Sequence, residues 1–174
     1  IYYDFFFFFK DVKLDILTIN SSSIIDKILK NELDIGLIEV DTQNSSLIKE
    51  KLADDELIVV SSDEKHPQIA FIDAIKKRWI LREIGSGTRE IFMNKIGEIA
   101  KELDIFMQLQ DFEEIKTIVL NNKNTVTVLS KVIVEKELKQ KKLFEIKLKN
   151  IEFKREFYLV YHKDKTKNLL FETF

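Results

Sequence analysis

The stretch with the clearest potential for chemistry is REIGSGTRE, from Arg82 to Glu90. The whole chain contains four glycines, and two of them, Gly85 and Gly87, stand here on either side of Ser86. Glycine adopts backbone angles that other residues avoid, and it lets backbone N–H groups come close to a ligand. The spacing therefore predicts a tight turn with exposed backbone amides.

Polar side chains follow directly. Ser86 and Thr88 carry hydroxyl groups, and the guanidinium of Arg89 suits a carboxylate or a phosphate. A helix that starts near Thr88 would add free N–H groups and a partial positive charge. This combination predicts an anion-binding site. The alternative is that the glycines only turn the chain and that Ser86 or Thr88 caps the helix.

The same stretch excludes several enzyme classes. No Gly-Lys-Ser/Thr follows the glycines, and the three-glycine dinucleotide pattern is absent. Ile84 and Thr88 stand where a nucleophile elbow needs glycine. His66 and His162 are the two histidines of the chain, and we interpret both as structural. We therefore expect no enzyme, no cofactor and no metal site.

Composition restricts the partners. Hydrophobic residues make up 45% of the 174 residues, enough for a sizeable core, and the net charge is only -2. Such a balance favours neither nucleic acid nor an anionic membrane. The chain has no cysteine, which is compatible with a reducing compartment, so we expect a cytoplasmic protein.

Five phenylalanines in succession, Phe5 to Phe9, cannot all face one core. This run is either an interface segment or an irregular start within a domain.

Apolar runs and segments of helical period alternate along the chain, which is typical of an α/β fold with a mostly parallel sheet. Helices are expected after Thr88, from Phe112, from Lys131 and near Ser22, the last with capping-box spacing between Ser23 and Asp26. A short closing helix is expected over residues 168–174. The expected strands are Val12 to Ile19, Leu33 to Val40, Glu56 to Pro67, Trp79 to Glu83, Ile105 to Gln110, Thr125 to Leu129, Leu143 to Leu148 and Arg155 to Lys163. We interpret the acidic run Asp54 to Glu56 as a solvated turn.

These segments together resemble the effector-binding domain of LysR-type transcriptional regulators. The closest match is WILREIGSGTREIF, and SSSIIDKILKNELDIGLIE, DDELIVVSSDEKHP and TVTVLSKVIVEKELKQKKLFEI followed by REFYLVYHKDK occur in the expected order. The likeness covers about Val12 to Phe174. The first strand of the family and its Ser/Thr loop are not recognisable.

The resemblance implies the fold of type 2 periplasmic binding proteins, with two lobes, each a mostly parallel sheet flanked by helices, joined by two crossing strands. Lobe I would comprise residues 1–56 and 164–174, and lobe II residues 57–163. It also implies a homodimer or homotetramer, and DNA binding only through an N-terminal winged helix-turn-helix that this chain lacks. The implied function is to bind a small effector in the cleft between the lobes and so control transcription.

Carried over by position, Ser86, Gly87, Thr88 and Arg89 would line the lobe II side of the cleft.

On the lobe I side, Asn20, Ser21 and Ser22 follow a strand and precede a helix, so we expect them to face the ligand from across the cleft. The alternative is that Ser21 and Ser22 only cap that helix. Glu39 would repel an anion unless it meets an amine or an arginine, so a small anionic or zwitterionic effector is expected. Thr127 is a further candidate at a strand end. The competing hypothesis is a solute-binding protein of an ABC-type uptake system, which has the same fold.

Overall fold

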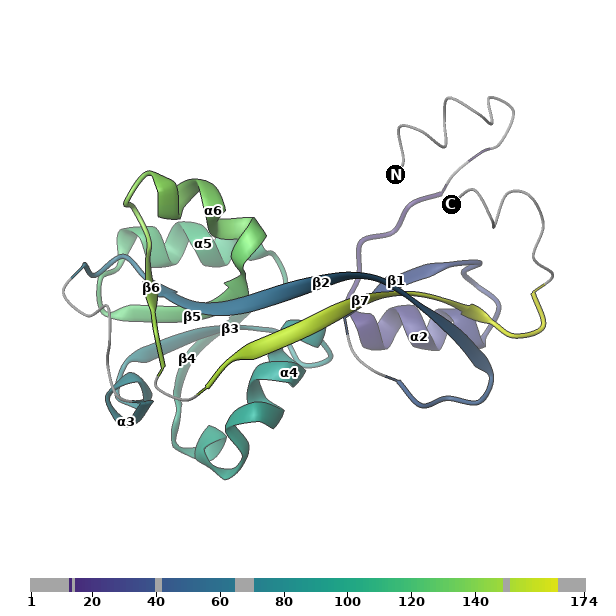
Figure 1. Ribbon diagram of the computed structural model, residues 1–174, viewed down its shortest axis with the longest axis horizontal. Coiled ribbons are helices and arrows are strands. Elements are labelled where there is room, and N and C mark those ends of the chain that lie inside the picture. The colour runs from purple at the N-terminus through teal and green to yellow at the C-terminus, as the bar shows by residue number, and fades with distance from the viewer. Residues whose placement is uncertain (1–12, 14, 40–41, 65–70, 149–150, 166–174) are drawn as a thin grey trace.

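The structure is a computed structural model that describes residues 13, 15–39, 42–64, 71–148 and 151–165. Within them a seven-stranded sheet has the order β1-β7-β2-β5-β3-β4, with β6 also paired to β2. Two bodies lie at opposite ends of the long strands β2 and β7 (Figure 1). We call the end with α2 and β1 lobe I, and the end with α3 to α6 and β3 to β6 lobe II. The expected α/β fold with two crossing strands is confirmed.

The crossing strands are the longest elements. β2 (Leu47–Ser61) pairs antiparallel with β7 (Phe153–His162) along almost its full length. The register shifts by one residue between Lys51 and Ala53, so Leu52 forms a bulge. The acidic run at 54–56 lies inside β2 and is not a turn. The predicted boundary between residues 56 and 57 falls within this unbroken strand, so the exact division into lobes stays a prediction.

Lobe II has the alternating strand and helix order that the periodicity indicates. The strands are β3 (Arg78–Arg82), β4 (Asp104–Leu109), β5 (Thr125–Ser130) and β6 (Phe144–Ile146). The helices are α3 (Phe71–Ile75), α4 (Gly87–Ile96), α5 (Phe112–Asn121) and α6 (Lys131–Lys139), and a 3-10 helix, η1 (Gly97–Glu102), follows α4. β3 pairs parallel with β4 and β5, whereas β2 pairs antiparallel with β5 and β6.

Lobe I differs from the expectation in three places. β1 (Gly36–Ile38) is shorter than the predicted strand and pairs antiparallel with β7. No strand forms over the described residues of Val12 to Ile19, where Ile16 and Leu17 are each more than half exposed and therefore gain little from burial. α2 (Ser21–Leu29) is capped by Asn20, whose side chain accepts from Ser23 N, instead of by a Ser23–Asp26 box. The Phe5 to Phe9 run, His66 and the closing helix lie outside the described residues.

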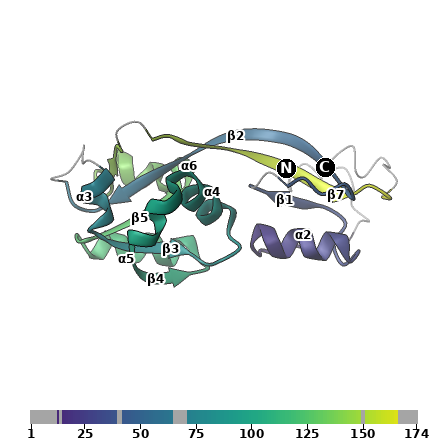
Figure 2. The same cartoon turned by 90° about the horizontal axis from the view of Figure 1, so that it is seen from below.

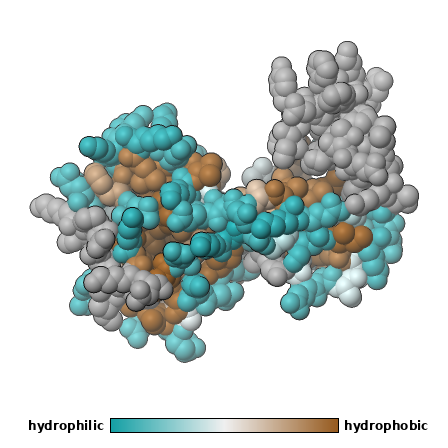
Figure 3. All heavy atoms as spheres, in the orientation of Figure 1, coloured by the Kyte–Doolittle hydropathy of each residue, from teal (hydrophilic) through white to brown (hydrophobic). Residues whose placement is uncertain are grey.

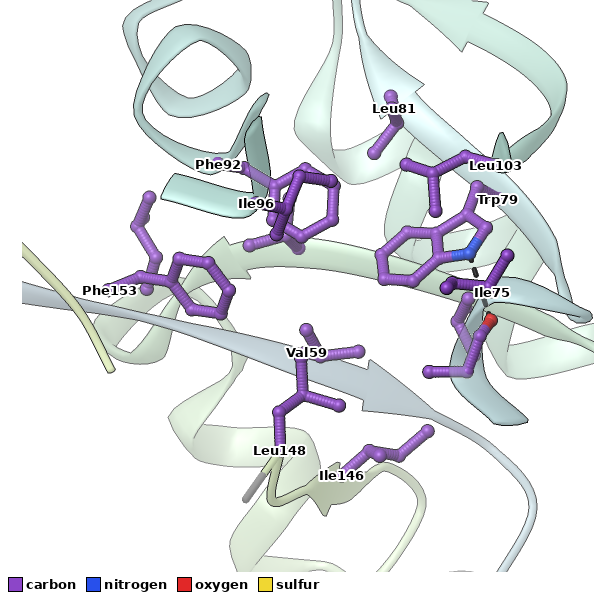
Figure 4. Packing of buried hydrophobic residues seen from close by; sticks show 14 residues of the cluster. Val59, Ile75, Trp79, Leu81, Phe92, Ile96, Leu103, Ile146, Leu148 and Phe153 are labelled. Carbon is purple, nitrogen blue, oxygen red and sulfur yellow. Dashed lines mark hydrogen bonds between the residues drawn. The ribbon is translucent and has the colours of Figure 1, made fainter. Parts of the chain in front are cut away.

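The largest apolar core lies in lobe II, between α4 and the sheet (Figure 4). Trp79 and Phe92 are fully buried, with ring centroids 4.9 Å apart, and Phe92 lies 5.4 Å from Phe153 of β7. The indole N–H of Trp79 donates to the Ala74 carbonyl over 3.0 Å. This packing fixes α4 against both β3 and a crossing strand. In Figure 3, by contrast, hydrophilic atoms cover much of the crossing between the lobes.

Candidate functional site

The loop between β3 and α4 leaves backbone amides free. Gly85 has a φ of 89°, which a side chain would oppose, and Ser86 is the N-cap residue of α4. The Ser86 side chain makes no capping bond, and its buried Oγ has no partner among the described residues. The amides of the next three residues, 87–89, likewise have no protein acceptor in that part of the chain. A helix start with unpaired donors attracts negative charge.

A pocket of about 550 Å³ lies at this loop, between the two lobes. Lobe I contributes the start of α2 and the segment after β1, and lobe II contributes the starts of α4, α5 and α6. Figure 2 shows α2 and α4 on the same side of the crossing strands, facing each other across this gap. Four helix N-termini therefore border one cavity.

The four helix starts are not equivalent. Asn20 caps α2 with a 2.9 Å bond, and Asp111 caps α5 by accepting from Glu113 N over 2.6 Å. At α6 the N-cap residue Ser130 makes no capping bond, because its Oγ donates to Asp55 over 2.9 Å. At α4, Ser86 also leaves the amides uncapped. The two uncapped ends, α4 and α6, are the ones with donors left for a ligand.

A buried arginine forms the base of the pocket. Arg155 of β7 donates from Nε to Asp55 Oδ2 over 2.6 Å, and both side chains are almost fully buried, at 2% and 3% exposed. Its Nη1 donates to Thr88 Oγ1 over 2.9 Å and lies 3.3 Å from Glu39 Oε1. The guanidinium also stacks on Phe157 at 4.8 Å. Arg155 thus joins a crossing strand, the start of α4 and lobe I.

The hydrogen bonds and ion pairs of Arg155 involve Nε and Nη1, and Nη2 has no partner within the described segments. Arg82, the other arginine that lines the pocket, is already paired with Glu83 through bonds of 2.9 and 3.2 Å. Each of the two arginines therefore keeps one guanidinium nitrogen without a partner among the described residues, Nη2 of Arg155 and Nη1 of Arg82, and these donors are left for a carboxylate or phosphate.

Six of the nine predicted site residues line the pocket: Asn20, Ser21, Glu39, Ser86, Gly87 and Thr88. Three do not. Ser22 is exposed beside it and contacts lobe II through long bonds to Gly85 O, 3.4 Å, and Glu90, 3.5 Å. Arg89 turns away, and its Nη1 donates to Arg82 O and to Gln108. Thr127 is fully buried within β5.

Sequence reasoning missed Arg155, Asp55 and Ser130. Arg155 opens an alternating apolar strand, and Asp55 directly precedes another, so each charge sits where a strand enters the core. The two residues lie directly opposite each other in the β2–β7 register. Opposite charges, each next to the apolar part of a strand, are the signal that could have paired them.

A second hollow of about 590 Å³ lies at the same ion pair and is lined by Asp54, Glu56, Lys131, Glu152 and Lys154, among others. Its charges are already matched. Lys131 bonds Glu56 at 2.6 Å, which raises the pKa of Lys131, and Lys154 lies 3.0 Å from Glu152. The interlobe pocket, with its unpaired donors, is the better binding site.

Two kinds of feature are absent from the described part of the chain. None of its helices has the length and apolar character needed to cross a bilayer. No group of three or more metal-ligating side chains gathers at one point there.

Comparison with solved structures gives the fold of this chain independently. The regulatory domain of Synechocystis PCC6803 CcmR in complex with 2-PG superposes with a TM-score of 0.82 at 21% identity, covering 99% of this chain and 84% of that one. The effector-binding domain of QuiR in complex with shikimate gives 0.80 at 17% identity, covering 99% and 83%. A proposed phosphate ABC transporter substrate-binding protein from Clostridium perfringens, with bound phosphate, gives 0.81 at 19% identity, covering 98% and 83%. At these identities the likeness concerns the fold alone.

Sequence comparison is more specific. The HTH-type transcriptional regulator CysL of Bacillus subtilis (strain 168) is 25% identical over 167 residues, which cover 92% of this chain and 55% of CysL. The uncharacterized HTH-type transcriptional regulator YeiE of Escherichia coli (strain K12) is 28% identical over 149 residues, covering 84% and 50%. The chain spans about half the length of these relatives. A family model described as LysR substrate binding domain matches residues 8–174, nearly the whole chain, and the chain therefore belongs to this family, the effector-binding part of LysR-type transcriptional regulators.

Proposed function

We propose that the interlobe pocket binds a small anionic or zwitterionic effector, and that this binding controls transcription by a longer regulator that contains the chain. The observation that carries the proposal is the uncapped start of α4. Its amides at 87–89 and the buried Ser86 hydroxyl have no acceptor among the described residues, and they open into a pocket large enough for a metabolite.

The charges support an anionic group at this end of the pocket. Arg155 has donors left on Nη2, and Asp55 and Thr88 fix its guanidinium in place. A preorganised guanidinium with free donors suits carboxylate and phosphate oxygens. Glu39 lies 3.3 Å from the same guanidinium, which also pairs with Asp55 at 2.6 Å, so an anion that binds Arg155 takes the place of the Glu39 carboxylate.

The structural neighbours fit the same size of ligand. CcmR was solved with 2-PG and QuiR with shikimate, both small molecules. For the longer protein we propose, by analogy with relatives named HTH-type regulators, a homodimer or homotetramer that contacts DNA through a separate N-terminal domain. An effector changes such an equilibrium only through its difference in affinity for the two lobe arrangements.

The test combines a thermal-shift screen of small metabolites with isothermal titration of inorganic phosphate, 2-PG and shikimate. We expect anions or zwitterions to raise Tm, because a ligand that binds only the folded chain stabilises it. In Ser86→Ala the Kd of a bound anion should rise about tenfold or more, as expected for the loss of one hydrogen bond to a charged group.

Ser45→Ala is the matched control, because it makes the same change at an exposed residue outside the pocket. Its Kd should equal that of the parent. A screen in which only cationic or uncharged compounds raise Tm, or a Ser86→Ala variant that binds anions as tightly as the parent, would contradict the proposal.

The solute-binding alternative shares the fold, as the Clostridium perfringens structure illustrates. The family model favours the regulator, because it describes LysR domains and matches nearly the whole chain.

A further inference from the structure

The chain places one of its own carboxylates at the anion-binding end of the pocket. Glu39 follows β1 in lobe I, yet its Oε1 lies 3.3 Å from Nη1 of Arg155. A β-carbon placed on Gly87 would lie only 2.7 Å from Glu39 Oε2 and 3.1 Å from Ser21 Oγ. The carboxylate therefore reaches both the arginine and the first residue of the uncapped helix.

Arg155 and Gly87 belong structurally to lobe II. Gly87 begins α4, and Arg155 is tied to that lobe by Thr88 of α4 and, through Asp55, by Ser130 at the start of α6. Among the described residues, the only other polar contacts between α2 and the segment around the start of α4 are those of Ser22, at 3.4 and 3.5 Å. The contact of Glu39 is therefore the ion pair that connects the lobes within the described residues.

We propose that Glu39 is an internal competitor of the effector: its carboxylate occupies the position of the ligand's anionic group in the ligand-free protein and holds the lobes together. An incoming anion displaces Glu39 from Arg155 and α4, so the anion binds in the same step in which the Glu39 contact between the lobes is broken. The inference deepens the proposed function and rests on it for the identity of the displaced position. The ligand must therefore be an anion that binds Arg155 and the start of α4 at least as well as the Glu39 carboxylate does.

The glycine at position 87 gives independent support. Its φ does not require glycine, so the reason for glycine there is space, and the atoms that fill this space are Glu39 and Ser21 of lobe I. Any larger residue would push the carboxylate away from the helix start. Two variants thus release the contact by different means: Glu39→Gln removes the charge, and Gly87→Ala removes the room.

The first measurement needs no ligand. The chain has no cysteine, so Asp26→Cys on α2 and Glu98→Cys on η1, both exposed, place two spin labels on opposite lobes. In double electron–electron resonance, Glu39→Gln and Gly87→Ala should each shift the interlobe distances to longer values. Glu83→Gln is the matched control, because Glu83 forms its ion pair with Arg82 of the same lobe; its distances should match the parent. Superimposable distributions for Glu39→Gln and the parent would overturn the proposal.

The second measurement is titration of inorganic phosphate. If Glu39 occupies the position about nine times out of ten, Glu39→Gln should lower the Kd about tenfold, since the competent fraction scales the apparent affinity. An unchanged Kd would show that Glu39 does not compete with the anion, and a raised Kd would show that Glu39 contacts the ligand instead. Either result overturns the inference. If distances respond but no anion binds parent or variant, the contact stands and the proposed effector class fails. If anion binding depends on Ser86 but Glu39→Gln leaves the interlobe distances unchanged, the proposed effector class stands and the proposed role of the Glu39 contact fails.

Discussion

Arg155 is a buried residue with a structural role, besides the binding role proposed for it above. The Asp55–Arg155 pair is removed from water, and it also accepts a hydrogen bond from Ser130 and donates one to Thr88, while Nη2 of Arg155 keeps no partner among the described residues. Buried pairs contribute little net stability compared with apolar residues, but removing one partner leaves an uncompensated charge. The pair therefore specifies how lobe II joins the crossing strands.

We expect Asp55→Asn to lower the free energy of unfolding by about 3–5 kcal/mol, the usual cost of breaking a buried ion pair. Urea denaturation followed by Trp79 fluorescence measures it. Asp54→Asn makes the same change one residue earlier, where the side chain is 79% exposed, and should alter stability by less than about 1 kcal/mol. Equal losses in the two variants would show that the burial of Asp55 has no energetic consequence.

The sequence predicts part of the site and not the rest, for physical reasons. The glycine loop was recognisable because local conformation requires those residue types. Arg89 looked suitable by type, but its Nη1 donates to a carbonyl and to Gln108 nearby in the fold, and its side chain does not line the pocket. Arg155 acts through partners that are distant in the chain, including Asp55, so no local pattern identifies it.

Among the elements, the helices differ in how their first turns are satisfied. Asp111 accepts two amide hydrogens at the start of α5, whereas Ser86 accepts none at α4. The cap of α5 contributes to stability, and the uncapped start of α4 is available for binding.

Asp111→Ala should therefore lower the free energy of unfolding by about 1 kcal/mol, the typical value of an N-cap. Ser86→Ala should leave it nearly unchanged in ligand-free protein, because the hydroxyl has no partner to lose among the described residues. Chemical denaturation in phosphate-free buffer compares the two. A larger loss for Ser86→Ala than for Asp111→Ala would show that the Ser86 hydroxyl is already bonded.

Elements with regular periodicity were predictable, and elements defined by partners were not. β3, β4 and β5 begin and end within two residues of their predicted bounds, and α5 and α6 begin at the predicted residues, Phe112 and Lys131. β2 was predicted too short, because three acidic residues in succession look solvated unless the arginine opposite one of them is known. The predicted strand from Val12 lacks a pairing neighbour in the described residues, and no feature of its own sequence reveals that.

At the scale of the whole molecule, the two lobes share β2 and β7, and the described residues of the two lobes form cores of unequal size. Four residues form the buried cluster of described residues in lobe I: Ile24, Ile28, Ile38 and Val160. So small a cluster gives little independent stability, and Val160 itself lies on a crossing strand. Lobe I thus depends on strands that lobe II holds in place.

We therefore expect the chain to unfold in one cooperative transition. Trp79 is the only tryptophan and lies in the lobe II core, so its fluorescence reports that lobe, while far-UV circular dichroism reports both. The two urea transitions should coincide, as in two-state unfolding. A circular dichroism transition that begins at clearly lower urea than the fluorescence transition would instead indicate that lobe I unfolds separately.

The bulge at Leu52 determines which β2 residues face each side of the sheet in the two lobes. On its lobe I side, even-numbered β2 residues oppose odd-numbered β7 residues, as Glu50 opposes Leu159; beyond it, odd opposes odd, as Asp55 opposes Arg155. Because side chains alternate in direction along a strand, the extra residue is what allows Glu50 and Asp55 to point to the same face. Removing Leu52 would turn every β2 side chain of one lobe to the wrong face of the sheet. The number of residues in this strand is therefore as constrained as their chemistry.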